Sequence, residues 1–281
     1  MKRIALLVLS CFSLFFGNIF AQSHQWTGNG GDANWFNASN WDAGTVPDAT
    51  STVAINGNFD VHIQAGPATV ESLELFSGAR LILEQDLETN SMIINNSGAI
   101  LEFISGTLSG AGIENDGLFK LTGNTNKVLD EIIINNQGEI HVFQSNQTQV
   151  LGTTINNAVS GLIDIASVGG FLQQSTNSVL NNNGILKKSN DGINPIGNFY
   201  LILEINNHGV IEVPEDETFL LLAGNSNFIN SELGTIRGSG TYDITANFIN
   251  SGKVVPGGDS EAGTMNITNN FALNGGWIEL D

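Results

Sequence analysis

The chain contains 281 residues, and 28 acidic against nine basic side chains give it a formal net charge of −19 at pH 7. This excess of negative charge argues against nucleic acid and anionic membrane surfaces as partners, because both bind basic patches. Asparagine (36 residues) and glycine (33) are abundant and proline (five) is rare. This composition predicts many tight turns and argues against long helices or a disordered linker.

Residues 1–21 have the layout of a secretory signal peptide. A basic start at Lys2 and Arg3 precedes an apolar run over residues 4–16, and Ala21 stands at the predicted cleavage site. The apolar run is shorter than the roughly 20 residues that span a bilayer. We therefore expect a secreted protein, extracellular or on the outer cell surface, whose mature part is not inserted in a membrane. Cleavage would remove the only cysteine, Cys11, and leave seven basic and 28 acidic residues, a formal charge of −21.

Residues 22–66 form a predicted N-terminal cap, because they lack the repeat that follows. Their main feature is the concentration of Trp26, Trp35 and Trp41 within sixteen residues. Three indoles can form the packed core of a small cap, or they can be exposed as a platform on which sugar rings stack. We favour the packed core and keep the glycan platform as the alternative.

A repeat runs through residues 67–281. Each unit has an apolar residue, one or more asparagines, a turn ending in glycine, and alternating apolar residues, as in 94–103. The asparagines recur at intervals of 20 to 26 residues, with a mean of 22. They are Asn95, Asn115, Asn135, Asn156, Asn182, Asn206, Asn230 and Asn250.

A unit of this length predicts an all-β fold, a right-handed parallel β-helix of about ten coils. Strands of three to five residues are too short to be stable alone, but they can pair with equivalent strands in the coils above and below. Helical repeats are disfavoured because no 3.6-residue apolar period is present. Spacings that are not multiples of six argue against a hexapeptide-based left-handed solenoid. The recurring asparagines are predicted to be structural, stacking their amides from coil to coil at one corner.

The C-terminal residues 270–281 end in a predicted strand with no closing cap. We therefore expect the chain to be part of a larger protein. An uncapped last coil would also favour end-to-end association of the rods.

Several segments carry a resemblance to a known class of proteins. Trp26-Thr27-Gly28, Asn34-Trp35 and Asn40-Trp41, then Gly44 and Val46-Pro47, resemble the opening of many secreted bacterial β-helix proteins. Residues 238–242, 248–252, 255–258 and 263–267 are similar to coils of autotransporter passenger domains and related adhesins. The resemblance covers nearly the whole mature chain and implies a β-helix displayed or released outside the cell. The chain departs from the pattern in having no β-barrel translocator.

The same scaffold also carries polysaccharide lyases and glycoside hydrolases, so we searched for catalytic groups. Arg80 and Arg237 are the only arginines of the mature chain, and nothing in the sequence places them beside carboxylates. The acidic residues fall singly in predicted turns, and residues 214–217 are predicted to be a solvated loop. The single acidic residues include Glu102, Glu139, Asp164 and Glu212.

Metal and cofactor chemistry is not indicated either. The four histidines are His24, His62, His141 and His208, and none is spaced as a metal pair. We therefore expect no catalytic residues, no metal and no cofactor. The leading hypothesis is a structural or adhesive surface protein whose partner is an extracellular glycan or a host or matrix protein. The alternative is a carbohydrate-active enzyme or sugar-binding module.

Overall fold

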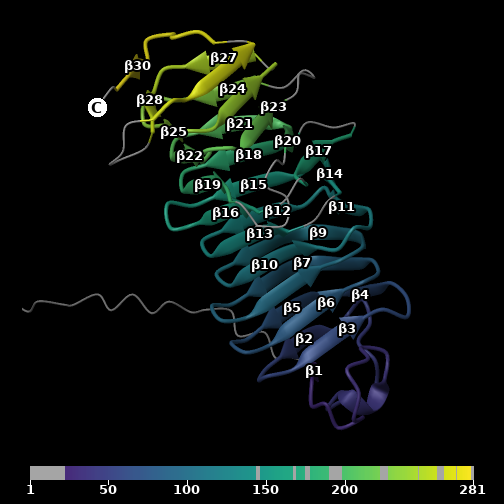
Figure 1. Cartoon of the computed structure of the whole chain (residues 1–281). Helices are drawn as coiled ribbons and strands as arrows, with labels where there is room; N and C mark the ends of the chain where they lie inside the picture. Colours follow the sequence, from purple (N-terminus) through teal and green to yellow (C-terminus); the bar gives the residue numbers. More distant parts are fainter. Residues whose placement is uncertain are drawn as a thin grey trace, which may run out of the picture.

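The computed structural model describes residues 23–143, 146–166, 169–174, 178–189, 198–221, 227–245, 247–257, 263–269 and 271–279. The predicted signal peptide lies outside these residues. The chain forms an all-β parallel solenoid of about nine turns, one fewer than the repeat predicts. Figure 1 shows the coils stacked along one axis, from β1 at the N-terminal end to β30 at the other.

Each coil contributes strands to three stacks, which we call the Asn face, the charged face and the third face. The Asn face contains β1 (His24–Gln25), β2 (Thr52–Ile55), β5 (Ser72–Leu75), β7 (Leu87–Asn95), β9 (Gly106–Asn115), β12 (Ile133–Asn136), β15 (Thr154–Asn157), β18 (Val179–Asn182), β21 (Glu204–Asn207), β24 (Asn227–Asn230) and β27 (Asn247–Asn250). The charged face contains β3 (Asp60–Ile63), β6 (Arg80–Leu83), β8 (Ile100–Phe103), β10 (Leu118–Thr122), β13 (Glu139–Phe143), β16 (Leu162–Ile165), β19 (Ile185–Lys188), β22 (Val210–Glu212), β25 (Thr235–Gly238), β28 (Lys253–Pro256) and β30 (Trp277–Ile278).

The third face contains β4 (Ala68–Val70), β11 (Lys127–Asp130), β14 (Thr148–Leu151), β17 (Phe171–Gln173), β20 (Asn198–Ile202), β23 (Thr218–Leu221), β26 (Thr241–Ile244) and β29 (Asn266–Asn269). The long strands β7 and β9 belong to two stacks, because their first halves pair on the third face and their second halves on the Asn face. A coil therefore runs from the third face through the Asn face to the charged face.

The core follows from the alternation of side chains along each short strand. In β10 the residues Phe119 and Leu121 are buried, while their neighbours point outward. The next strand of the same face repeats the pattern with Ile140 and Val142. Because equivalent apolar residues stack from coil to coil, one continuous hydrophobic core runs along the axis.

The stacks begin before the boundary that the repeat predicts at residue 67. Strand β2 already pairs with β5, and β3 already pairs with β6. The short strand β1 covers the edge of β2, and the 3₁₀ helix Ala38–Asn40 lies in the cap. The repeat pattern does not reveal this first coil, because the coil lacks the corner asparagine that marks the later ones.

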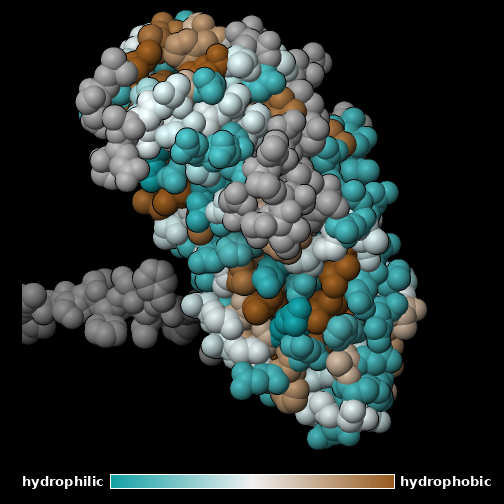
Figure 2. All heavy atoms as spheres, in the orientation of Figure 1, coloured by the Kyte–Doolittle hydropathy of each residue, from teal (hydrophilic) through white to brown (hydrophobic). Residues whose placement is uncertain are grey.

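The opposite end of the solenoid is more apolar at its surface. The exposed side chains there include Phe271, Leu273, Trp277 and Ile278. Figure 2 shows hydrophobic residues gathered at this end, above a body whose visible surface is mostly hydrophilic. The N-terminal end differs from it because the cap buries its three indoles.

Candidate functional site

The charged face carries a column of ionisable side chains that point away from the core. Strand register stacks Glu102, Lys120, His141, Asp164, Lys187, Glu212 and Arg237 in successive coils. Neighbours in this column are one strand spacing apart, about 4.8 Å. Acidic and basic side chains alternate along the column on either side of His141, so that oppositely charged neighbours on adjacent strands attract each other.

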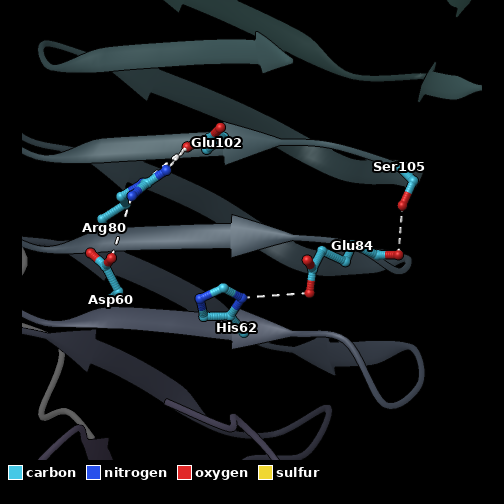
Figure 3. A network of polar contacts seen from close by, with 6 residues as sticks. All are labelled: Asp60, His62, Arg80, Glu84, Glu102 and Ser105. Atoms are coloured by element: carbon cyan, nitrogen blue, oxygen red, sulfur yellow. Dashed lines mark hydrogen bonds and ion pairs between the residues drawn. The ribbon is translucent and has the colours of Figure 1, made fainter. Parts of the chain in front are cut away.

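The N-terminal part of the charged face holds the densest network, which Figure 3 shows on β3, β6 and β8. Arg80 Nε donates to Glu102 Oε2 at 2.9 Å, and Arg80 Nη1 lies 3.3 Å from Asp60 Oδ2. Thr122 Oγ1 donates to the second oxygen of Glu102 at 2.7 Å. Both oxygens of Glu102 are therefore hydrogen-bonded within the protein.

Burial raises the pKa of Glu102, but hydrogen bonds from Thr122 and Arg80 and the charge of Arg80 outweigh it, so the net pKa lies below the usual value. Beside this network, His62 Nδ1 lies 3.5 Å from Glu84 Oε2. Similar pairs follow along the face: Lys187 with Asp164 at 3.4 Å and Arg237 with Glu212 at 2.7 Å.

The seven lysine and arginine side chains beyond residue 21 are confined to two places. Five lie on the charged face, namely Arg80, Lys120, Lys187, Arg237 and Lys253. The other two, Lys127 and Lys188, are buried. In the described part of the chain, the Asn face and the third face thus expose acidic but no basic side chains.

Two expectations about charged residues are corrected here. The arginines do lie beside carboxylates, and Glu102, Glu139, Asp164 and Glu212 lie on strands rather than in turns. The reason is that the arginine–carboxylate pairs of this solenoid join residues 20 or more positions apart, which local sequence does not reveal.

The segment 214–217 is a solvated loop only in part. Glu215 and Asp216 are exposed, but Glu217 is buried, and its carboxylate lies 3.2 Å from Lys188 Nζ. Neither side chain of this pair is more than 1% exposed. A pair so deeply buried is costly to break, because removing one partner leaves an unpaired charge in the core.

Lys127 is buried without a carboxylate partner among the described residues. Its Nζ donates to the main-chain oxygens of Thr125 at 3.1 Å and Gly123 at 3.4 Å. Burial lowers its pKa from 10.5 to about 8, because desolvation disfavours the charged form. Unlike Lys188, this buried lysine therefore bears a desolvation cost that no carboxylate among the described residues offsets.

Substituting Lys127 by methionine is expected to stabilise the fold by about 1 to 3 kcal/mol at pH 7, since it removes a poorly solvated ammonium. In the unmodified protein the folded state binds fewer protons than the unfolded state between about pH 8 and 10.5. Stability should therefore rise with pH in this window through this residue, and the rise should shrink in Lys127→Met. Urea unfolding at pH 7, 8, 9 and 10 measures both effects, and an unchanged pH dependence in the variant would refute the assignment.

The corner asparagines form a continuous buried hydrogen-bond chain. In each step the side-chain amide nitrogen donates to the side-chain oxygen one coil further along, at 2.6 to 2.7 Å. We call this the inner ladder; its members are Asn95, Asn115, Asn136, Asn157, Asn182, Asn207, Asn230 and Asn250, all 0% exposed. Stacked amides of this kind polarise one another and hold neighbouring coils in register.

A second chain, the outer ladder, runs beside it on the surface of the Asn face. Its members are Asn135, Asn156, Asn181 and Asn206, and each nitrogen donates toward the N-terminal end at 2.9 to 3.1 Å until Asn135 reaches Glu114 at 2.6 Å. The eight predicted corner residues divide between the two ladders. Asn95, Asn115, Asn182, Asn230 and Asn250 lie on the inner one, while Asn135, Asn156 and Asn206 lie on the outer one.

The three tryptophans lie in the core of the cap. Their side chains are 0 to 3% exposed, and the Trp35 and Trp41 rings meet edge to face with centroids 4.8 Å apart. Trp26 meets Trp41 in the same way at 5.0 Å, and Trp41 Nε1 donates to the Trp35 main-chain oxygen at 2.8 Å. With no exposed indole face, these residues offer no stacking surface to a sugar.

Two further features bear on function. In the described ranges, no three histidine, cysteine or acidic side chains are grouped so as to hold a metal ion. His62 and His141 point outward, each beside a glutamate. Across the same residues, no helix combines the length and the apolarity that a membrane crossing requires.

Comparison with known proteins adds no family assignment. No protein-family model, no curated protein and no solved structure matches the chain. The structure and the repeat establish the architecture: a parallel β-solenoid whose coils are joined by two asparagine ladders and by ion pairs on the charged face.

Proposed function

We propose that the protein is a secreted or cell-surface structural and adhesive solenoid that performs no catalysis. The observation that carries this proposal is how the ionisable side chains are paired. The acidic and basic groups that lie closest together form ion pairs with one another instead of facing an open cleft. Arg80 lies between Asp60 and Glu102, and Lys188 forms a buried ion pair with Glu217. What remains outward is a repetitive surface along a rod.

The carboxylates of the charged face are poorly suited to sugar hydrolysis. A glycosidase needs a carboxylic acid with a raised pKa facing a second carboxylate across open space. The pKa of Glu102 is lowered, and a guanidinium separates it from Asp60. Asp164 is three coils from Glu102, roughly 14 Å at the usual strand spacing.

The passenger-type character rests on the cap residues that carry the resemblance. Gly28 and Gly44 have φ values of 68° and 66°, which favour glycine, and the indoles of Trp35 and Trp41 pack together. A packed indole pair and two such glycines fit a cap that closes one end of a rod, which supports the proposal. A capped, acidic rod is a suitable spacer or adhesive stalk outside a cell.

The test is an array of glycans and matrix proteins probed with residues 22–281, with product release followed in the same wells. Saturable binding without release of sugar or peptide products supports the proposal. Turnover at an ordinary enzymatic rate, with kcat of about 1 per second or more, would overturn it in favour of a carbohydrate-active enzyme.

A further inference from the structure

A shallow groove runs along the corner where the Asn face meets the charged face. Its volume is about 700 Å³, and it crosses four successive coils, from the turn at Ser97 to Leu162. Glycines at this corner, among them Gly117 and Gly138, form its floor. Close stacking of the coils requires glycine at this corner, because a Cβ on Gly138 would lie 2.3 Å from the Gly117 main-chain oxygen.

The two walls of the groove differ in chemistry. One wall is formed by the outward residues at the start of β8, β10, β13 and β16. Ile100, Leu118 and Leu162 make it largely apolar, and Glu139 lies between the two leucines. The other wall is polar and is formed by exposed turn residues that include Asp116 and Gln137. A ligand in the groove would therefore meet mainly apolar contact and the Glu139 carboxylate on one side, and hydrogen-bonding turn residues on the other.

The polar wall has unused hydrogen-bonding capacity. Within the described residues, neither the Asp116 carboxylate nor the Gln137 side-chain amide has a hydrogen-bond partner, whereas the nearby Ser160 hydroxyl donates to the Gln137 main-chain oxygen at 3.0 Å. Asp116 and Gln137 occupy the same turn position in successive coils, since their main-chain nitrogens donate to Asn95 and Asn115 respectively. They are therefore about 4.8 Å apart along the axis.

These features favour a ligand whose repeat distance matches the coil spacing, which has hydroxyl groups and which carries no negative charge. An extended pyranose chain advances by nearly one coil spacing per ring, whereas an extended peptide advances about 3.4 Å per residue and would lose register. Hydroxyl groups can donate to Asp116 and Glu139, and the carbon-bound faces of the rings can contact the apolar wall. The carboxylates of Asp116 and Glu139, in a protein of charge −19, would repel an anionic polysaccharide.

We propose that this groove binds an extended neutral polysaccharide lying parallel to the solenoid axis, with about one sugar ring per coil. This inference rests on the proposed adhesive function and gives it a site and a ligand class. It also differs from the glycan platform suggested by the tryptophans, which are buried at the cap.

The experiment measures binding of the mature chain to neutral hexasaccharides (β-1,4-glucan, β-1,3-glucan and β-1,4-mannan), to hexagalacturonate and to oligolysine. The test variant is Asp116→Ala combined with Gln137→Ala. The matched control is His208→Ala, because His208 has the same turn position but lies beyond the groove. Circular dichroism melting checks that all three proteins are equally folded.

We expect at least one neutral hexasaccharide to bind, and the double variant to lose about tenfold or more in affinity, as the loss of two hydrogen-bonding groups implies. The control should keep its affinity. Equal affinity in the double variant and the control, preference for hexagalacturonate or oligolysine, or no binding of any neutral hexasaccharide would each overturn the proposal. Adhesion to a matrix protein that survives in the double variant would leave the adhesive function standing while removing the groove from it.

Discussion

Replacing Gly184 with alanine is expected to destabilise the solenoid by about 3 kcal/mol, the upper range for overpacking a tight site. The added methyl group would lie 2.2 Å from the Gly161 main-chain oxygen and 2.3 Å from that of Ala158. Both atoms belong to the backbone of the preceding coil, so they can yield only if two coils move apart. Such a movement would also stretch the nearby inner ladder, since Asn157 Nδ2 lies 2.9 Å from the same methyl position.

Urea unfolding followed by far-ultraviolet circular dichroism measures this effect. The matched control is Gly66→Ala, because a Cβ at Gly66 meets no atom within 4 Å. The control should change stability by no more than about 0.5 kcal/mol. Equal unfolding midpoints for the two variants would show that the corner does not require glycine.

The substitution Asn157→Ala should cost a similar amount, about 3 kcal/mol or more. Asn157 accepts a hydrogen bond from Asn136 and donates to Asn182, both at 2.7 Å, and its nitrogen also lies 3.2 Å from the Gly161 main-chain oxygen. Alanine removes these bonds and leaves the buried Asn182 oxygen without its donor, a penalty of about 1 to 3 kcal/mol for that group alone.

The neighbouring residue provides the control for the ladder. Asn156 lies one position away on the outer ladder, is only partly buried, and bonds to Asn135 and Asn181 at 2.9 Å. Because water can replace these partners, Asn156→Ala should cost about 1 kcal/mol. If Asn156→Ala proved as destabilising as Asn157→Ala in the same urea titration, the distinction between the two ladders would be wrong.

Both predictions depend on how the coils are stacked. In a solenoid each coil contacts only its neighbours, so a defect at one corner weakens two interfaces directly. The effect of either variant should therefore be concentrated around β12 to β21, and hydrogen exchange there should accelerate more than in the cap. Figure 1 places these strands in the middle of the rod, away from both ends.

Much of the architecture could be predicted because it follows from the periodic pattern of the sequence. Alternating apolar residues, as in Ile140 and Val142, indicate strands, and an Asn–turn–Gly unit recurring every 22 residues indicates stacked coils. The three tryptophans likewise indicate a packed cap, which the burial of Trp35 bears out. None of these inferences requires knowing which distant residues meet.

The candidate surfaces could not be predicted in this way, because they depend on strand register and on contacts between residues far apart in the sequence. In Asn135-Asn136 and Asn156-Asn157 the sequence alone does not say which member of each pair faces inward, because shifting a strand by one residue exchanges its two faces. Insertions in the turns lengthen some coils, so the register between neighbouring strands is still harder to predict from the spacing.

The sequence by itself determined that this chain is a repetitive, acidic β-solenoid with a tryptophan-rich first segment, since composition and period are local properties. Only the tertiary structure decided which asparagines form the inner ladder, that Glu217 is buried against Lys188, and that Arg80 lies between two carboxylates. The physical reason is that these contacts join successive coils through strand pairing, and coils of 20 to 26 residues align by hydrogen bonding and core packing rather than by sequence distance.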